Sequence, residues 1–200
     1  MIGVMAEKAE EGTEIAVISD SHVPDRADQI PEKFWDKIES ADIVVHAGDF
    51  AREETFNALD HYSTEFHGVK GNCDFFEVDE MGESKTFEAE GLKFGVYHGT
   101  GITPRGHRPT LEKIAEEDLE CDILVHGHSH QRDIYLGDSL LLNPGSCTGV
   151  GGGTARPSNP EMVEIIIKDE KIEVTVIEKQ EEELIREESK SFNREEIKEA

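Results

Sequence analysis

The sequence has little cysteine and no long hydrophobic run, and both shortages exclude classes of protein. Its three cysteines, Cys73, Cys121 and Cys147, form no CxxC pair and no disulfide framework. No stretch approaches the roughly 18 consecutive apolar residues needed to cross a bilayer. The first residues, MIGVMAEKAEEGTE, lack both the basic and the apolar region of a signal peptide. We therefore expect a reduced, cytoplasmic protein that has no membrane-spanning segment.

Basic residues are also scarce: 20 Lys and Arg stand against 45 Asp and Glu, which gives a formal net charge of −25. A surface this acidic repels phosphate backbones and anionic lipids, so a nucleic-acid polymer or a membrane surface is an unsuitable partner. The acidity favours solubility, and a salt-rich cytoplasm would screen the self-repulsion. A hydrophobic content of 36% over 200 residues still allows one domain with a real core.

Apolar runs alternate with helix-like stretches over the first two thirds of the chain. The runs that indicate strands are 15–18, 43–45, 94–97 and 123–125. Three of them are almost continuously apolar, as expected of strands that are buried on both faces. The stretches that indicate helices are 31–39, 52–60 and 109–119. Alternation of this kind predicts an α/β architecture.

The last third of the chain has a different pattern, with two polar turns that predict antiparallel hairpins. The hairpin segments are 132–136 with 139–142, and 163–167 with 172–177. Residues 145–160 are rich in glycine, serine and proline but lack the GK[ST] of a phosphate-binding P-loop, and we interpret them as a flexible surface loop. We predict a loose tail for residues 1–13, a folded domain for 14–180, and a charged helix or disordered tail for 181–200.

The ends of five predicted strands carry residues that can bind a metal ion. The five motifs are Asp20-Ser21-His22, Gly48-Asp49, Gly71-Asn72-Cys73-Asp74, His98-Gly99 and Gly127-His128-Ser129-His130. A single histidine after a strand usually has a structural role, but five such motifs in succession do not arise by chance. Because the carboxyl ends of strands in an open α/β sheet meet at one edge, we expect these side chains to form one site.

The ligand types restrict the metal. Imidazole, carboxylate and amide oxygen without thiolate exclude the usual structural zinc sites and suit an open, catalytic centre. Seven ligands are too many for one ion that also binds a substrate, whereas two ions about 3.5–4 Å apart accommodate them. We expect two divalent ions, with Mn²⁺ as the first candidate and Ni²⁺, Fe²⁺, Co²⁺ or Zn²⁺ as alternatives. Two such ions, two carboxylates and a bridging hydroxide leave a net charge of about +1, which attracts phosphate.

The five motifs together resemble the calcineurin-like metallophosphoesterases, in particular a small bacterial and archaeal phosphodiesterase branch that carries GNCD where larger members carry GNH(D/E). The resemblance covers about residues 14–178. It implies a four-layer αββα sandwich of two mixed β-sheets flanked by helices. It also implies a metal site made by Asp20, His22, Asp49 and His130, and a second made by Asp49, Asn72, His98 and His128. Asp49 would bridge the two ions.

The resemblance implies an enzyme that hydrolyses small phosphodiesters. The metals polarise the phosphoryl oxygens, and a metal-bridging hydroxide attacks phosphorus in line. The residues assigned to catalysis itself are Asp49, Asn72 and His98. Two alternatives stay open: a nuclease of the same superfamily, which the net charge disfavours, and a non-catalytic scaffold that uses the metal site as a binding surface. The expected partner is a small-molecule phosphoester, and the sequence allows a homo-oligomer.

One position departs from the larger members of that family. Cys73 stands where they have the histidine proposed to assist the leaving group. A thiol with an ordinary pKa near 8.5 is a poor substitute, so we expect substrates with good leaving groups. Asp74 is a candidate for orienting a metal ligand from behind. The candidates for contacting a substrate phosphate are Arg105, His107, Arg108 and Arg156.

Overall fold

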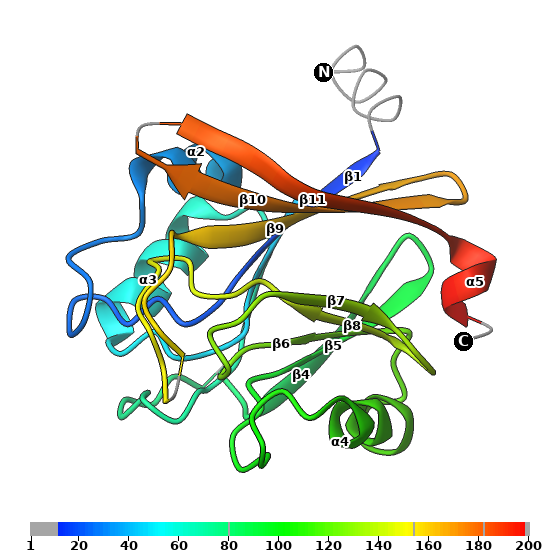
Figure 1. Ribbon diagram of the computed structural model, residues 1–200, viewed down its shortest axis with the longest axis horizontal. Helices are drawn as coiled ribbons and strands as arrows, with labels where there is room; N and C mark the ends of the chain where they lie inside the picture. The colour runs from blue at the N-terminus through cyan, green and yellow to red at the C-terminus, as the bar shows by residue number, and fades with distance from the viewer. Residues whose placement is uncertain (1–11, 80, 154, 182, 199–200) are drawn as a thin grey trace.

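Two β-sheets pack face to face in the computed structural model, which describes residues 12–79, 81–153, 155–181 and 183–198 (Figure 1). The first sheet has six strands in the order β11-β10-β9-β1-β2-β3, and the second has five in the order β4-β5-β6-β8-β7. The strands of the first sheet are β1 (Thr13–Ile18), β2 (Ile43–His46), β3 (Phe66–Gly68), β9 (Glu161–Lys168), β10 (Lys171–Gln180) and β11 (Glu183–Asn193). Those of the second are β4 (Ser84–Ala89), β5 (Leu92–Tyr97), β6 (Ile123–His126), β7 (Asp133–Leu136) and β8 (Leu140–Asn143).

Strand β1 shows why the apolar runs are continuous. Ile15 and Val17 are fully buried in the core between the two sheets. Their neighbours Ala16 and Ile18 lie in a second core, on the opposite face of the same strand. Successive side chains of a strand point to opposite faces, so a strand with a core on each side has no polar position.

Helices cover the outer faces of both sheets. Phe34 of α2 (Glu32–Ser40) and Leu59 of α3 (Glu53–Tyr62) pack in the core on the outer face of the first sheet. Leu111 of α4 (Arg108–Lys113), which continues into the π-helical turn η1 (Ile114–Leu119), packs with Leu124 on the outer face of the second sheet. The layers are therefore helix, sheet, sheet, helix, and the αββα sandwich is confirmed.

Both predicted hairpins are present, since β7 pairs antiparallel with β8 and β9 with β10. The prediction for the C-terminal segment was wrong. Residues 183–193 form β11, which pairs with β10 along its whole length and buries Phe192, and the helix α5 spans Arg194–Lys198. Residues 1–11 of the predicted N-terminal tail lie outside the described residues, and Thr13 already belongs to β1.

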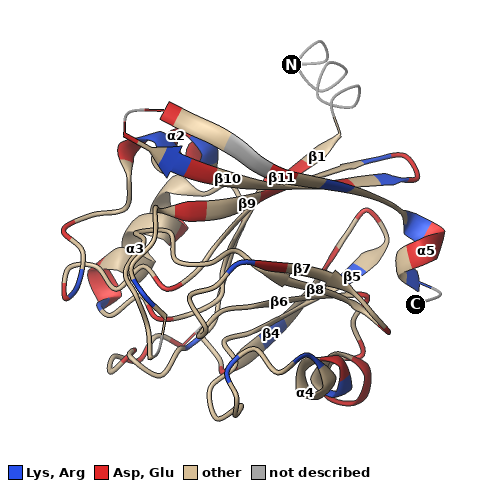
Figure 2. Ribbon diagram, in the orientation of Figure 1, with Lys and Arg blue, Asp and Glu red and all other residues tan. Residues whose placement is uncertain are grey.

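Acidic residues lie on the helices and on β9, β10 and β11 of the first sheet (Figure 2). Within the part of the chain that the structure describes, no helix is both long enough and apolar enough to cross a membrane.

Parallel pairing decides where the loops meet. Ile18 of β1 pairs with His46 of β2, and Tyr97 of β5 pairs with His126 of β6, so each pair of strands ends at the same level. The residues that follow these four strands leave from the carboxyl edges of the two sheets, where ligands bind in α/β folds.

Candidate metal centre

The loops that follow the strands are held together by backbone hydrogen bonds. The amide of Asp20 donates to the carbonyl of Gly48 over 3.0 Å, and the amide of His22 donates to the carbonyl of Asp49 over 3.0 Å. The second sheet joins them through the amide of His128, which donates to Asp20 Oδ2 over 3.1 Å. The motifs from both sheets therefore meet in one place.

Two carboxylates and three imidazoles converge at this meeting point. The potential ligand atoms of Asp20, His22, Asp49 and His130 all lie within 4.8 Å of one another, and all four residues are buried. His130 Nε2 is 3.2 Å from Asp20 Oδ1, and His22 Nε2 is 3.4 Å from Asp49 Oδ2. His98 Nε2 approaches the same Asp49 oxygen to 3.5 Å from the other sheet. Asp49 Oδ2 thus lies between His22, which follows a strand of the first sheet, and His98, which follows a strand of the second.

The second predicted ligand set is less completely assembled. His98 and His128 lie edge to face with their ring centroids 5.0 Å apart. Asn72 is exposed, and its amide nitrogen donates to Cys73 Sγ over 3.2 Å. The backbone of its motif is nevertheless docked on the centre, because the amide of Cys73 donates to Asp49 Oδ1 over 2.7 Å. The motif therefore contacts Asp49 through the backbone of Cys73, while the Asn72 side chain is hydrogen-bonded to the Cys73 thiol.

Unpartnered buried atoms show that the residues present fit a metal ion. Among the described residues, the buried side-chain atoms without a hydrogen-bond partner include Asp20 Oδ1, His98 Nε2 and His128 Nδ1. Buried polar atoms in folded proteins are nearly always partnered, so three such atoms at one place require an explanation. Oxygen and imidazole nitrogen are ligands of divalent transition metals.

Hydrogen bonds behind the histidines fix which ring nitrogen faces the centre. Nδ1–H of His98 donates to the carbonyl of Ala47 over 2.7 Å, and Nδ1–H of His130 donates to the carbonyl of Val150 over 2.6 Å. In the neutral imidazole each bond leaves Nε2 as the nitrogen with the free lone pair. Carbonyl partners of this kind orient the imidazole ligands of metal sites.

Strained backbone also gathers here. Five non-glycine site residues have left-handed φ angles: Asp20 (53°), His22 (49°), Asp49 (63°), His128 (67°) and His130 (56°). This region of φ is uncommon for residues with a side chain and costs of order 1–3 kcal/mol each. Such strain concentrates at functional sites, where it aims side chains that a relaxed backbone would direct elsewhere.

Burial and neighbouring charges shift the pKa values of the groups at the centre. Burial lowers the pKa values of His22 and His128 to about 4, so both imidazoles are neutral near pH 7. Burial also opposes a charge on His98, but Asp49 and Asp20 outweigh it and raise its pKa to about 9. The pKa of Asp49 is held well below its usual range, since contacts with His98 outweigh the effect of burial. In the metal-free protein, His98 and Asp49 therefore form a buried ion pair.

Asp74 holds two ligand loops together. Its carboxylate accepts hydrogen bonds from the backbone amides of Asp49 (2.9 Å), Ala51 (2.8 Å) and Gly71 (2.8 Å). It thus orients the backbone that carries Asp49. Beside it, burial and the charge of Asp49 raise the pKa of the Cys73 thiol to about 12, so this thiol stays protonated.

The glycine-rich segment 145–160, interpreted from the sequence as a flexible surface loop, forms a wall of the centre instead. Val150 supplies the carbonyl that orients His130, and the hydroxyl of Ser146 donates to the carbonyl of Asp20 over 2.8 Å. Gly152 lies directly against the His130 ring, where a Cβ would collide with imidazole carbons. The run of three glycines at 151–153 allows this close approach, although such a run is equally typical of a flexible loop.

The residues predicted to contact a phosphate do not all lie at the centre. Arg105 lies at the centre, since its guanidinium donates to the carbonyl of His128 over 3.1 Å. Arg108 forms an ion pair of 2.6 Å with Asp133 and lies over the ring of Tyr135.

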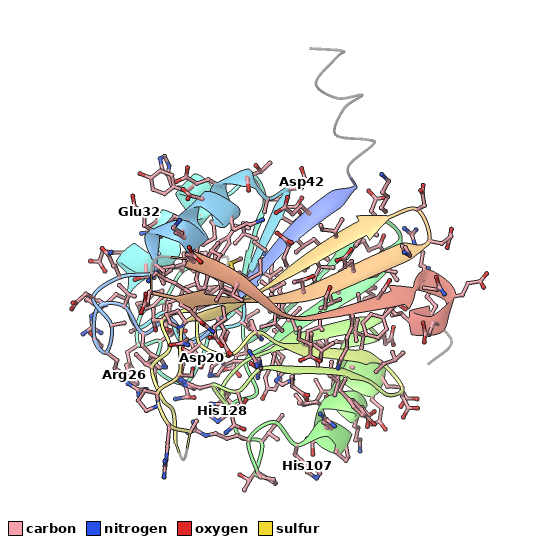
Figure 3. The ribbon with its side chains drawn as sticks, turned by 45° about the horizontal axis from the view of Figure 1, so that its top comes forward. Asp20, Arg26, Glu32, Asp42, His107 and His128 are labelled. Atoms are coloured by element: carbon pink, nitrogen blue, oxygen red, sulfur yellow. The ribbon has the colours of Figure 1, made fainter. Side chains whose placement is uncertain are left out.

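His107 binds the Thr110 hydroxyl at the start of α4, and Arg156 is in the glycine-rich segment without a hydrogen bond or ion pair among the described residues. Sequence reasoning missed Arg26, whose guanidinium donates to the carbonyl of Gly151. Figure 3 places Arg26 on the same side as Asp20 and His128.

Comparison with known proteins decides the family. The model of the calcineurin-like phosphoesterase superfamily domain matches residues 14–184. The chain belongs to the calcineurin-like phosphoesterase superfamily. A probable metallophosphoesterase of the archaeon Methanothermobacter thermautotrophicus is 36% identical over 164 residues, which cover 82% of this chain and 91% of the relative. The resemblance inferred from the five motifs is confirmed, and so is the small prokaryotic branch.

Solved structures of this superfamily fold agree. Vacuolar protein sorting 29 from Cryptosporidium parvum has a TM-score of 0.83 at 23% identity, covering 91% of this chain and 98% of that one, and supports the fold. Wild-type Vps29 from Entamoeba histolytica complexed with Zn²⁺ has a TM-score of 0.76 at 28% identity, covering 91% and 99%. Family membership and the Asp/His cluster together support divalent metal binding by this calcineurin-like phosphoesterase.

Proposed function

We propose that the protein is a dinuclear metal-dependent phosphodiesterase that hydrolyses small phosphodiesters. The observation that carries the proposal is the buried convergence of Asp20, His22, Asp49 and His130. Buried ligand atoms of Asp20, His98 and His128 that lack a hydrogen bond accompany it. Membership of a phosphoesterase superfamily supports the reaction class.

Each ligand would have a defined place. Asp20, His22 and His130 would hold one ion, Asn72, His98 and His128 the other, and Asp49 both. Bound divalent ions supply Lewis acidity toward the phosphoryl oxygens and an easily deprotonated water for in-line attack. The oxygen and imidazole donors without thiolate suit Mn²⁺, Ni²⁺, Fe²⁺, Co²⁺ and Zn²⁺. Of these ions we propose Mn²⁺ first. Asn72 would reach its ion by turning its side chain away from Cys73.

The chain's own charges favour a small anionic substrate. Although the net charge is −25, the guanidinium groups of Arg26 and Arg105 bind carbonyls of the loops that surround the centre. They would help to orient a phosphate already held there. Cys73 keeps its proton to a pKa of about 12, so it is a weak acid toward a leaving alkoxide. Esters with good leaving groups are therefore the favoured substrates.

A non-catalytic scaffold is the second candidate, and the likeness to vacuolar protein sorting 29 favours it. In that case the same pocket of ligands would stabilise a binding surface. The buried atoms of Asp20 and His98 that lack a hydrogen bond fit either candidate, because both require only that a metal binds. Turnover separates the two.

The test is turnover by protein stripped of metal and reloaded with one ion at a time. We expect hydrolysis of bis(p-nitrophenyl) phosphate that depends on the added ion and is highest with Mn²⁺. His22→Ala should lose this activity, whereas His61→Ala, an exposed histidine of α3, should keep it. If the protein bound metal but no ion gave turnover, the phosphodiesterase proposal would be contradicted and the non-catalytic scaffold would be the remaining candidate.

A further inference from the structure

An exposed aromatic ring lies beside the centre, and the metal chemistry gives it no role. Phe75 directly follows the Gly71–Asp74 motif, and its side chain is 87% exposed. Among the described residues, the other large hydrophobic side chain that lies exposed is Tyr62 of α3, at 54%. A single exposed aromatic residue is ordinary on a protein surface. The surroundings of Phe75 give it significance.

Phe75 lines a pocket of about 410 Å³ whose lining also includes Asn72. Tyr97 and Thr100, on either side of the proposed ligand His98, belong to the same lining. The pocket therefore lies between two loops that each carry a proposed ligand. Its volume is within the range of about 300–1,000 Å³ that is typical of small-molecule sites. An ester group of a phosphate held at the centre would have this space available to it beside Asn72.

The residues that line the pocket indicate which kind of ester group would bind there. Phe75 supplies an aromatic ring, and the exposed residues Glu77 and Glu83 supply carboxylates. Lys70 supplies the one positive charge of the lining. A second phosphate would be repelled by the two carboxylates, and an aliphatic alcohol would make no use of the ring. A flat ring that carries N–H or O–H donors would use both features, and a nucleobase is such a ring.

We propose that this pocket binds the base of a small nucleotide ester, with the base stacked on Phe75 and its donors facing Glu77 or Glu83. The inference rests on the proposed function, because the metal centre must hold the phosphate. It makes Phe75 a specificity-determining residue and narrows the substrate class to nucleoside phosphoesters.

Equilibrium binding of two matched probes tests the pocket without turnover. Adenosine 5′-monophosphate and ribose 5-phosphate share the phosphate and the sugar and differ only in the base. Calorimetry on the metal-loaded protein should show tighter binding of the nucleotide, by about 5- to 150-fold, the range for a base stacked on an aromatic ring. Phe75→Ala should abolish this preference, and Phe75→Trp should retain it. Tyr62→Ala, the matched exposed aromatic, should leave it unchanged.

Equal affinities for the two probes, binding of neither, or a preference that survives Phe75→Ala would overturn the inference. Its failure is distinguishable from that of the proposed function. Diester turnover without a base preference would contradict the proposed base site and support the proposed phosphodiesterase. A preference for the nucleotide that depends on Phe75, in a protein without turnover, would support the base site and contradict the phosphodiesterase.

Discussion

Adding one methyl group at Gly152 should weaken metal binding without unfolding the protein. Gly152 is buried and lacks a left-handed φ, so its backbone accepts alanine, but the new Cβ would overlap the imidazole of His130. The new Cβ would lie 2.2 Å from His130 Cδ2. Carbon atoms in contact lie about 3.5–4.0 Å apart, so the ring must move by more than about 1 Å. Metal–ligand distances deviate from their usual values by only about 0.2 Å. Loss of a group that orients a ligand typically reduces metal affinity 10- to 100-fold, and we expect a loss of about that size.

The assay is a calorimetric titration of the metal-free protein with Mn²⁺ and with Zn²⁺. Elemental analysis then gives the amount of bound metal. Gly82→Ala is the matched control, because Gly82 also lacks a left-handed φ and its nearest neighbour is the carbonyl of Ser84 at 3.1 Å. The thermal midpoint of the metal-free protein shows whether the fold is retained. If Gly152→Ala bound metal as tightly as the wild type, the packing of this loop on His130 would have no part in the site.

Three further predictions concern single groups of the centre. Asn72→Ala should lower activity and metal content, whereas Asn72→Asp should retain binding with an altered metal preference; unchanged stoichiometry in Asn72→Ala would exclude Asn72 as a ligand. Cys73→His should flatten the dependence of kcat/KM on leaving-group pKa, because it installs a proton donor worth about 10²–10⁴-fold; parallel slopes at equal metal content would return Cys73 to a packing role. His98, with a pKa of about 9, is protonated in the metal-free protein near pH 7 and must lose that proton to bind metal. Affinity should therefore rise about tenfold per pH unit from pH 7 to 9 and level off above, with one proton released in calorimetry in two buffers; a pH-independent affinity would contradict this ion pair.

Much of the fold could be predicted because burial on two faces leaves a local signal. Each residue of 15–18 is buried in a core on one side of β1 or the other, so the run is apolar whatever else the chain does. The ligand motifs were equally visible, since the residue types at strand ends are determined by chemistry and their convergence by parallel pairing.

Strand β11 could not be predicted, because its signal is not local. Residues 183–193 are mostly charged and polar, which favours a solvated helix or tail when they are considered alone. Pairing with β10 supplies the backbone hydrogen bonds, and burial of Phe192 anchors the strand. Tertiary pairing thus overrode composition.

The role of the glycine-rich loop was hidden for a related reason. Glycine runs occur both in flexible linkers and where backbones approach closely, and composition does not distinguish the two. Only the position of Gly152 against His130, a residue 22 positions earlier, separates them. Arg26 was missed because no motif accompanies it, and its link to Gly151 is formed between distant segments.

Replacement of Asp49 tests the central claim most directly. Its carboxylate lies between His22 and His98, and in the proposed centre it is the ligand that both ions share. The measurement is metal stoichiometry together with diester turnover for the wild type and Asp49→Ala, with circular dichroism to verify the sheets. Two ions per wild-type chain, and a folded Asp49→Ala protein with less metal and no turnover, are the results that we predict. An active Asp49→Ala protein with undiminished metal content would contradict the dinuclear centre.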